Sequence, residues 1–170
     1  MYLIRKNVDS KETKMNICFD KVADDLLMIS ITNQMLYDGI LSYWRLTKVK
    51  EMPPLEIGIE CKNGCIISTT FFMDMSCIKK QESFDIHKNK GNVLVDTTIF
   101  TKVNDFVDVF QGYEIDIQKG KLICIFGEGD EFIQSYQNDR FEIYVDSLNQ
   151  VIGFALCDLS EEEINTINSL

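Results

Sequence analysis

The side chains with the most capacity for chemistry are acidic, and they gather in the second part of the chain. Residues 1–100 hold 13 acidic and 13 basic side chains, whereas residues 101–170 hold 14 acidic and 4 basic ones, so the later segment carries the whole net charge of −10. A region of one sign attracts cations and basic surfaces and repels nucleic acid and anionic membranes. The charge therefore predicts a basic protein partner and argues against nucleic acid and membrane surfaces.

Nucleophilic catalysis has little support in the residue types present. A serine or cysteine nucleophile usually needs a histidine base, and the chain has one histidine, His87, in a lysine-rich segment. A histidine in such a setting is typical of a solvated loop. No catalytic residue is predicted, and a non-enzymatic function is favoured.

The six cysteines form no recognisable metal or redox motif. Cys61 and Cys65 are the nearest pair, but their spacing differs from the C-x-x-C of zinc sites, and a hairpin turn between them would put them on opposite faces. Most of the others lie in apolar strand-like runs, where cysteine is a small buried hydrophobe in a reducing compartment. No disulfide, metal site or cofactor is therefore predicted. With no apolar leader and no run long enough to span a membrane, the expected compartment is the cytoplasm.

One acidic segment keeps a metal-dependent alternative open. Gly127–Glu131 combines glycines with carboxylates, and oxygen ligands on a glycine-rich loop suit Ca²⁺ or Mg²⁺. The order of its residues does not match a calcium-binding EF-hand loop, and a solvated turn is the interpretation that turn chemistry favours.

Three β-hairpins are expected, and two of them depend on the residue at the turn. Asn63-Gly64 predicts a type I′ turn between apolar runs, which sets Ile59 opposite Ser68. The third hairpin spans 141–156, and Asn149 is expected to take the left-handed position of its three-residue loop.

The second hairpin, with Lys119-Gly120 at its turn, positions part of the acidic set. Its alternation places apolar side chains on one face and Glu114 and Asp116 on the other, as in a sheet that is buried on one side only. Because Ile123 and Ile125 also point to the polar face, that face is expected to be partly covered.

Helices are fewer than strands. Ser160–Glu163 forms a capping box, which predicts a short C-terminal helix. Residues 101–110 have apolar side chains at helical spacing and are predicted as a helix, with a strand as the alternative. Residues 79–92 are predicted as a surface loop, and further strands are expected at 26–32, 40–49 and 93–100.

These patterns predict a single domain over residues 1–170 of the α+β class, an antiparallel, hairpin-rich sheet with a short C-terminal helix. An all-β sandwich is the alternative. A chain of this length buries a substantial core without disulfides.

If the second and third hairpins are neighbours, their acidic side chains make one face. The predicted function is a non-enzymatic binding protein that presents this face to a basic protein, as an immunity-type inhibitor does when it neutralises a basic toxin. The alternatives are a carboxylate enzyme that uses a divalent metal, and an assembly subunit that pairs through strand edges. The residues predicted to bind the partner are Glu114, Asp116, Glu128, Asp130, Glu131, Asp139 and Glu142.

Overall fold

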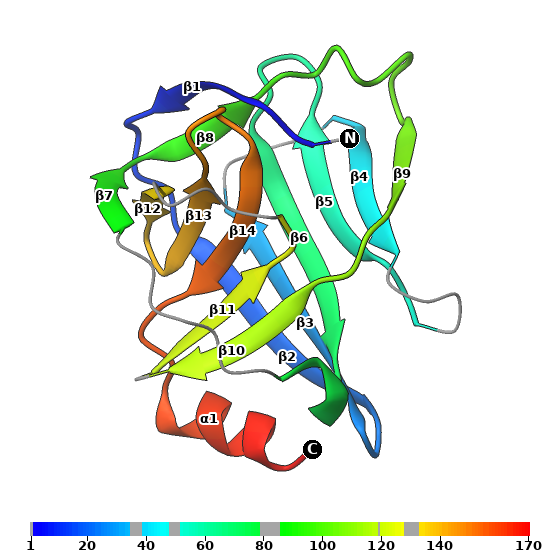
Figure 1. The fold of residues 1–170 in the computed structure, drawn as a ribbon, viewed down its shortest axis with the longest axis vertical. Coiled ribbons are helices and arrows are strands. Elements are labelled where there is room, and N and C mark those ends of the chain that lie inside the picture. The colour runs from blue at the N-terminus through cyan, green and yellow to red at the C-terminus, as the bar shows by residue number, and fades with distance from the viewer. Residues whose placement is uncertain (1, 35–38, 48–51, 79–85, 119, 128–132) are drawn as a thin grey trace.

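The computed structural model describes the chain except for residues 1, 35–38, 48–51, 79–85, 119 and 128–132 (Figure 1). The described part is mostly β, with antiparallel-rich sheets and one short C-terminal helix. Two six-stranded sheets lie in a sandwich-like arrangement, which is consistent with both the α+β prediction and its all-β alternative.

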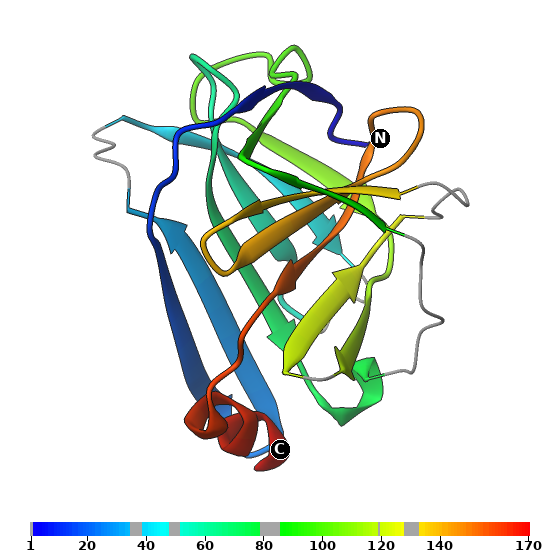
Figure 2. The same ribbon diagram turned by 90° about the vertical axis from the view of Figure 1, so that its left-hand side faces the viewer.

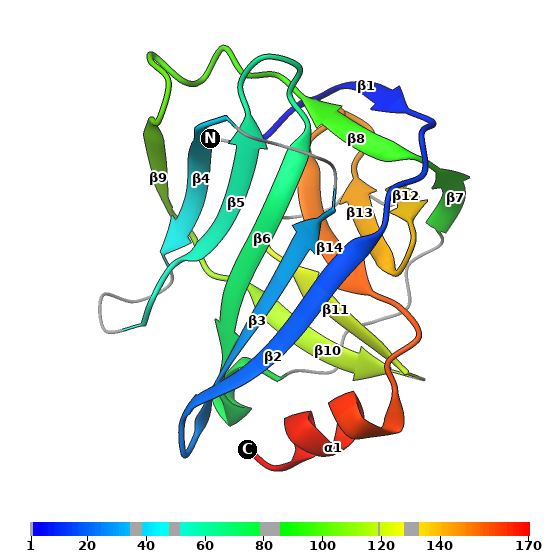
Figure 3. The same ribbon diagram turned by 180° about the vertical axis from the view of Figure 1, so that it is seen from behind.

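The first sheet has the strand order β2-β3-β6-β5-β4-β9 and is the nearer layer in Figure 3. All its pairings are antiparallel except that of β9 with β4, which is parallel. Its strands are β2 (Met15–Ala23), β3 (Leu26–Asn33), β4 (Leu41–Thr47), β5 (Leu55–Glu60), β6 (Ile66–Met73) and β9 (Phe106–Phe110).

The second sheet has the order β10-β11-β14-β13-β12-β7, with one parallel pairing, between β12 and β7. A separate antiparallel pair is formed by β1 (Arg5–Asp9) and β8 (Asn92–Val95). The second sheet consists of β7 (Ile86–Lys90), β10 (Glu114–Gln118), β11 (Lys121–Ile125), β12 (Ile133–Asn138), β13 (Phe141–Val145) and β14 (Val151–Leu156).

The core lies between the inner faces of the two sheets. The Trp44 ring of β4 meets Phe126, just after β11, with ring centroids 5.5 Å apart, and Phe71 of β6 meets Phe154 of β14 at 5.2 Å. Trp44 and Phe71 have no exposed surface. These aromatic contacts between the sheets place Trp44 in the core.

The C-terminal helix α1 (Glu161–Asn168) begins with the predicted capping box. The Ser160 side chain accepts a hydrogen bond from the backbone N–H of Glu163, and the Glu163 carboxylate accepts one from that of Ser160. Figure 2 shows α1 near the end of the β2–β3 hairpin at which the turn lies. There Lys21 donates to the Ser169 carbonyl at 3.2 Å. A 3₁₀ turn, η1 (Met75–Cys77), follows β6.

Two of the three hairpins have the predicted register. The β10–β11 pair sets Gln118 opposite Lys121, and Asn149 in the β13–β14 loop has φ of 63°, the predicted left-handed conformation. In the first hairpin both the type I′ turn and the register are wrong. Asn63 does not have a positive φ, and the Glu60 N–H donates to the Cys65 carbonyl at 2.9 Å across a loop of four residues. Gly58, not Ile59, therefore lies opposite Ser68.

Two predictions of local structure are also wrong. Residues 101–110 contain no helix: Phe106–Phe110 is strand β9, with Val107 and Val109 packed on the core and the phenylalanines exposed. The predicted loop 79–92 holds strand β7 in its described part, and β8 begins at Asn92. In both segments pairing with a distant strand, β4 or β12, decides the conformation.

Candidate functional site

The second and third hairpins lie side by side, because β11 pairs with β14 in antiparallel register. One row across the four strands consists of Asp116, Ile123, Ala155 and Glu142. Side chains in one row of a sheet point to the same face. The pairing therefore brings acidic side chains of both hairpins to one face of the second sheet.

The burial of the predicted acidic residues differs from what the alternation suggested. Glu114 is partly exposed and Asp139 is exposed, whereas Asp116 and Glu142, expected to face solvent, are only 3% and 1% exposed. Glu128, Asp130 and Glu131 lie outside the described residues. Of the predicted carboxylates in the described residues, only Glu114 and Asp139 are therefore accessible to solvent.

A small apolar cluster on the same face is one reason for this burial. Ile133, Tyr144, Ile152 and Ala155 are buried together, apart from the main core, and three partly buried isoleucines pack on them: Ile86, Ile123 and Ile125. The prediction of a partly covered face, made from Ile123 and Ile125, agrees with this finding. Carboxylates beside such a cluster lose water and need partners within the protein.

Glu142 has such a partner in Lys121, to which it forms an ion pair. Burial is the largest single influence and would raise the pKa of Glu142. The hydrogen bonds from Lys121 and Ser135 and the charges of Lys121 and Lys88 together outweigh burial, so the pKa lies below its ordinary value. Burial by itself would lower the pKa of Lys121. The hydrogen bond to Glu142 and the negative charge nearby act in the other direction, so the pKa of Lys121 is raised. Both side chains are therefore charged at neutral pH.

Three further polar side chains lie beside this pair, those of Tyr144, Cys157 and Ser135. The Tyr144 hydroxyl donates to Glu142 Oε2 at 3.4 Å, and the Cys157 sulfur lies 3.6 Å from the same oxygen. Burial raises the pKa of Tyr144 and raises that of Cys157 to about 11. Because the thiolate is the nucleophilic form, this shift of the pKa lowers the reactive fraction of Cys157 at neutral pH.

Glu142 Oε1 and Ser135 Oγ are buried and make no hydrogen bond of ordinary geometry among the described residues. The Ser135 hydroxyl nevertheless lies close enough to Glu142 to lower its pKa. Ser135 has no exposed surface and lies opposite Tyr144 on the neighbouring strand. With a protonated lysine, a protonated thiol and an ionised carboxylate, the cluster has the chemistry of a hydrogen-bond acceptor for a donor group.

The opposite edge of the same face is basic. Lys88 and Lys90 of β7 pair in register with Ser135 and Gln137 of β12, and both lysines are exposed. The face thus runs from carboxylates on β10, across the isoleucines, to lysines on β7. His87, also on β7, is exposed.

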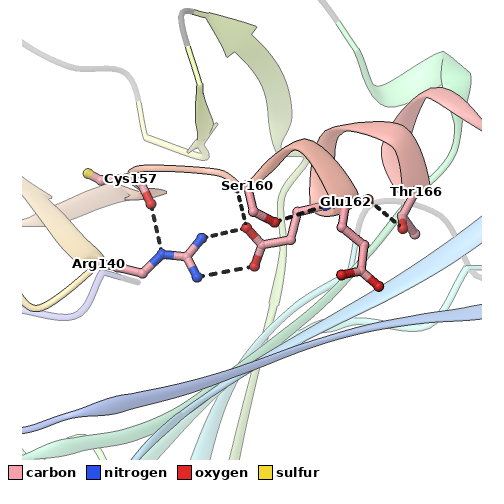
Figure 4. A network of polar contacts seen from close by, with 6 residues as sticks. Arg140, Cys157, Ser160, Glu162 and Thr166 are labelled. Carbon is pink, nitrogen blue, oxygen red and sulfur yellow. Dashed lines mark hydrogen bonds and ion pairs between the residues drawn. The ribbon is translucent and has the colours of Figure 1, made fainter.

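A network that the sequence analysis missed holds α1 against β13. Arg140 donates from Nε to the Cys157 carbonyl at 3.1 Å and pairs with the Glu163 carboxylate at 2.6 Å (Figure 4). The capping box gave the role of Glu163 within the helix, but nothing local to the sequence indicates Arg140 as its second partner. Glu163 therefore closes the cap and also anchors the helix.

The cysteines are largely as expected. Cys65, Cys124 and Cys157 are buried and Cys61 is intermediate, but Cys18, expected to be buried, is exposed on edge strand β2. Those five are free thiols. Within the described ranges, no group of three or more His, Cys, Asp or Glu side chains could hold a metal ion.

Comparison with protein-family models finds no match to the chain, and comparison with curated proteins finds none either. In the part of the chain that the structure describes, no helix has the length and apolar character needed to cross a membrane.

Proposed function

We propose that the chain is a non-enzymatic binding protein whose acidic face, on β10, β11, β13 and β14, takes a basic protein partner. The observation that carries the proposal is the β11–β14 pairing, which joins the two hairpins that hold Glu114, Asp116 and Glu142. The partner class we infer is a basic toxin in the cytoplasm, neutralised by an immunity-type inhibitor.

Electrostatics gives the proposed mechanism. The net charge of −10 resides in residues 101–170, so a basic partner would be steered to the β10 side of the face. Steering of this kind raises the association rate constant. Carboxylates that pair with lysines or arginines of the partner would then block the partner's active site.

The burial pattern separates two roles within the predicted binding set. The accessible Glu114 and Asp139, together with Glu128, Asp130 and Glu131, would supply the steering charge. The buried Asp116 and Glu142 would not. Asp116 accepts a hydrogen bond from Gln118, and Glu142 is paired with Lys121. Glu142 Oε1 would be one further acceptor for a guanidinium or ammonium group that reaches it.

The proposal is tested by affinity capture from the source lysate at low and high salt, with a charge-reversed variant and a matched control. The variant Glu114→Lys/Asp139→Lys reverses two of the predicted charges. Because Asp139 Oδ2 also accepts the Met15 N–H at 2.9 Å, the variant must first show the melting temperature of the wild type. The control Asp24→Lys/Asp25→Lys makes the same change in net charge at the exposed β2–β3 turn. We expect a basic protein to be captured by the wild type and the control, lost with the variant, and released by salt.

The association rate then provides the quantitative test. With the captured protein, the rate constant should fall steeply between about 50 mM and 500 mM salt, as expected for steered association. A rate insensitive to salt, or equal for the variant and the control, contradicts the proposal. Reversal of Asp130 and Glu131 tests the remaining predicted residues in the same assay.

A further inference from the structure

Strand β9 leaves one edge of the first sheet open, and it carries the largest exposed aromatic side chains of the described chain. β9 is the last strand in the sheet order, and β4 is its only partner among the strands that the structure describes (Figure 1). Phe106 is 47% exposed and Phe110 is 78% exposed. An open strand edge with exposed apolar side chains is a template for pairing with another strand.

The parallel pairing with β4 decides which backbone groups of β9 face the open edge. The Tyr43 N–H donates to the Asp105 carbonyl, and the Gln111 N–H donates to the Thr47 carbonyl. Because successive residues of a strand direct their peptide groups to opposite sides, the odd-numbered residues bond to β4 and the even-numbered ones point outward. The outward peptide groups therefore belong to Phe106, Asp108 and Phe110.

These same three residues are the centre and the ends of a palindrome. The sequence of β9 is Phe-Val-Asp-Val-Phe, which reads alike in both directions. Two antiparallel copies related by a two-fold axis at Asp108 would set Phe106 of each opposite Phe110 of the other. Phe106 opposite Phe110, and Asp108 opposite Asp108, are then hydrogen-bonded pairs. In such a pair the two residues exchange both N–H···O bonds.

We propose that β9 pairs with β9 of a second copy of this chain, in antiparallel register centred on Asp108, so that the first sheets of the two copies become continuous. This is an isologous contact, in which the same surface serves both partners. The Phe106 N–H, which now donates to Asp105 Oδ1 at 3.0 Å, exchanges that carboxylate for the Phe110 carbonyl of the second copy.

The aromatic side chains fit this register. Tyr43 of β4 stacks on Phe106 with centroids 5.6 Å apart and planes 11° from parallel, and the Arg45 guanidinium lies 4.6 Å from the Phe106 centroid. Phe110 of the second copy would lie on the other side of Phe106 and extend the stack. Cross-strand aromatic pairs of this kind stabilise sheets.

The charges at the centre also fit. Two Asp108 side chains face each other at the axis, and like charges directly opposite are unfavourable. Each Asp108 is already paired with Arg45 of its own chain, Nε to Oδ1 at 2.6 Å and Nη2 to Oδ2 at 2.9 Å. The two ion pairs would meet at the axis as an alternating network of charges.

The predicted dimer is weak, because a strand of five residues buries little surface beside the roughly 1,600 Å² of a standard interface. It is also independent of the acidic face, since β9 belongs to the other sheet. Failure of this inference would leave the proposed function untouched.

Light scattering over a concentration series tests the dimer. The wild-type mass should double between about 1 µM and 1 mM. Phe110→Lys should remain monomeric over the same range. The control Leu148→Lys, an equally exposed apolar residue (65%) on the β13–β14 loop, should behave as the wild type. A melting temperature equal to that of the wild type shows that both variants are folded.

Oxidative cross-linking tests the register in a background where the exposed Cys18 is replaced by serine. Asp108→Cys faces itself across the axis at about 5.5 Å between Cα atoms, which is within disulfide range. Phe106→Cys is displaced from its own copy by four residues, about 13 Å along the strand, and should not cross-link. A wild type that is monomeric throughout, a dimer that persists in Phe110→Lys, or cross-linking at 106 in place of 108 would overturn the inference.

Discussion

Removal of the Lys121 ammonium group is expected to destabilise the protein strongly, because it leaves the Glu142 charge buried without a partner. Glu142 is 1% exposed, and the Lys121 side chain is 24% exposed. Breaking a buried pair in this way costs about 3–5 kcal/mol. Because solvent still reaches Lys121, the lower end applies, and we expect Lys121→Met to lose about 3 kcal/mol, a fall in Tm of about 6–12 °C for a domain of this size.

The pH dependence of that loss follows from the two pKa shifts. The pKa of Glu142 is lowered from 4.5, so its contribution is present above pH 4.5 and is lost as the pH falls through the folded-state value. The pKa of Lys121 is raised from 10.5, so its contribution is present below pH 10.5 and is lost as the pH rises through the folded-state value. The difference between wild type and Lys121→Met should therefore be fully developed at neutral pH and should narrow below pH 4.5.

Urea unfolding at pH 7 and at pH 3.5 provides the assay, with a double-mutant cycle. Lys121→Met/Glu142→Gln should recover most of the stability lost in the single variant, because no charge is then left unpaired. Lys62→Met, at an exposed turn position, is the matched control and should change stability by less than about 0.5 kcal/mol. A loss below about 1 kcal/mol in Lys121→Met, or one equal at both pH values, would refute the assignment of a buried ion pair.

Three further outcomes are expected. Ser160→Ala should reduce the free energy of unfolding by about 1 kcal/mol through loss of the helix cap, measured by urea denaturation, and no change would argue against the cap. Gly64→Ala should destabilise by at least about 2 kcal/mol in the same assay, because φ is +78° and an added Cβ would overlap the Val95 carbonyl; a neutral effect would contradict the described loop. At pH 8 a thiol reagent should modify the exposed Cys18 quickly, whereas Cys157, with its pKa raised to about 11 by burial, should react only in urea; equal rates in the native protein would contradict the burial of Cys157.

Local patterns in the sequence were sufficient for much of the fold. The β10–β11 register follows from alternation with a turn at residues 119–120, and the left-handed Asn149 and the Ser160 cap follow from short-range chemistry. Each of these features depends on residues that are close together in the sequence. The register predicted for the first hairpin was wrong because its loop holds the four residues 61–64, where a two-residue Asn63-Gly64 turn was expected.

Long-range pairing explains the other errors. Phe106–Phe110 has a spacing compatible with a helix, and only the edge of β4, some sixty positions earlier, makes it a strand. Asp116 and Glu142 alternate as solvent-facing residues do, but the apolar cluster that buries this face draws members from β7, β12 and β14. The ion pair of Lys121 with Glu142 depends on which hairpins are neighbours, which the separate hairpin patterns do not contain.

The position of β14 in the second sheet bears on how the chain folds as it leaves the ribosome. Val151–Leu156 lies between β11 and β13 and is the last strand to be synthesised, so until it emerges the β10–β11 hairpin and the β12–β13 hairpin have no shared neighbour. Phe71 of the first sheet, which contacts Phe154, lacks that contact for the same period. Nascent chains that stall before residue 151 should therefore expose apolar surface and depend on chaperones, and closure of the core should occur in one late step.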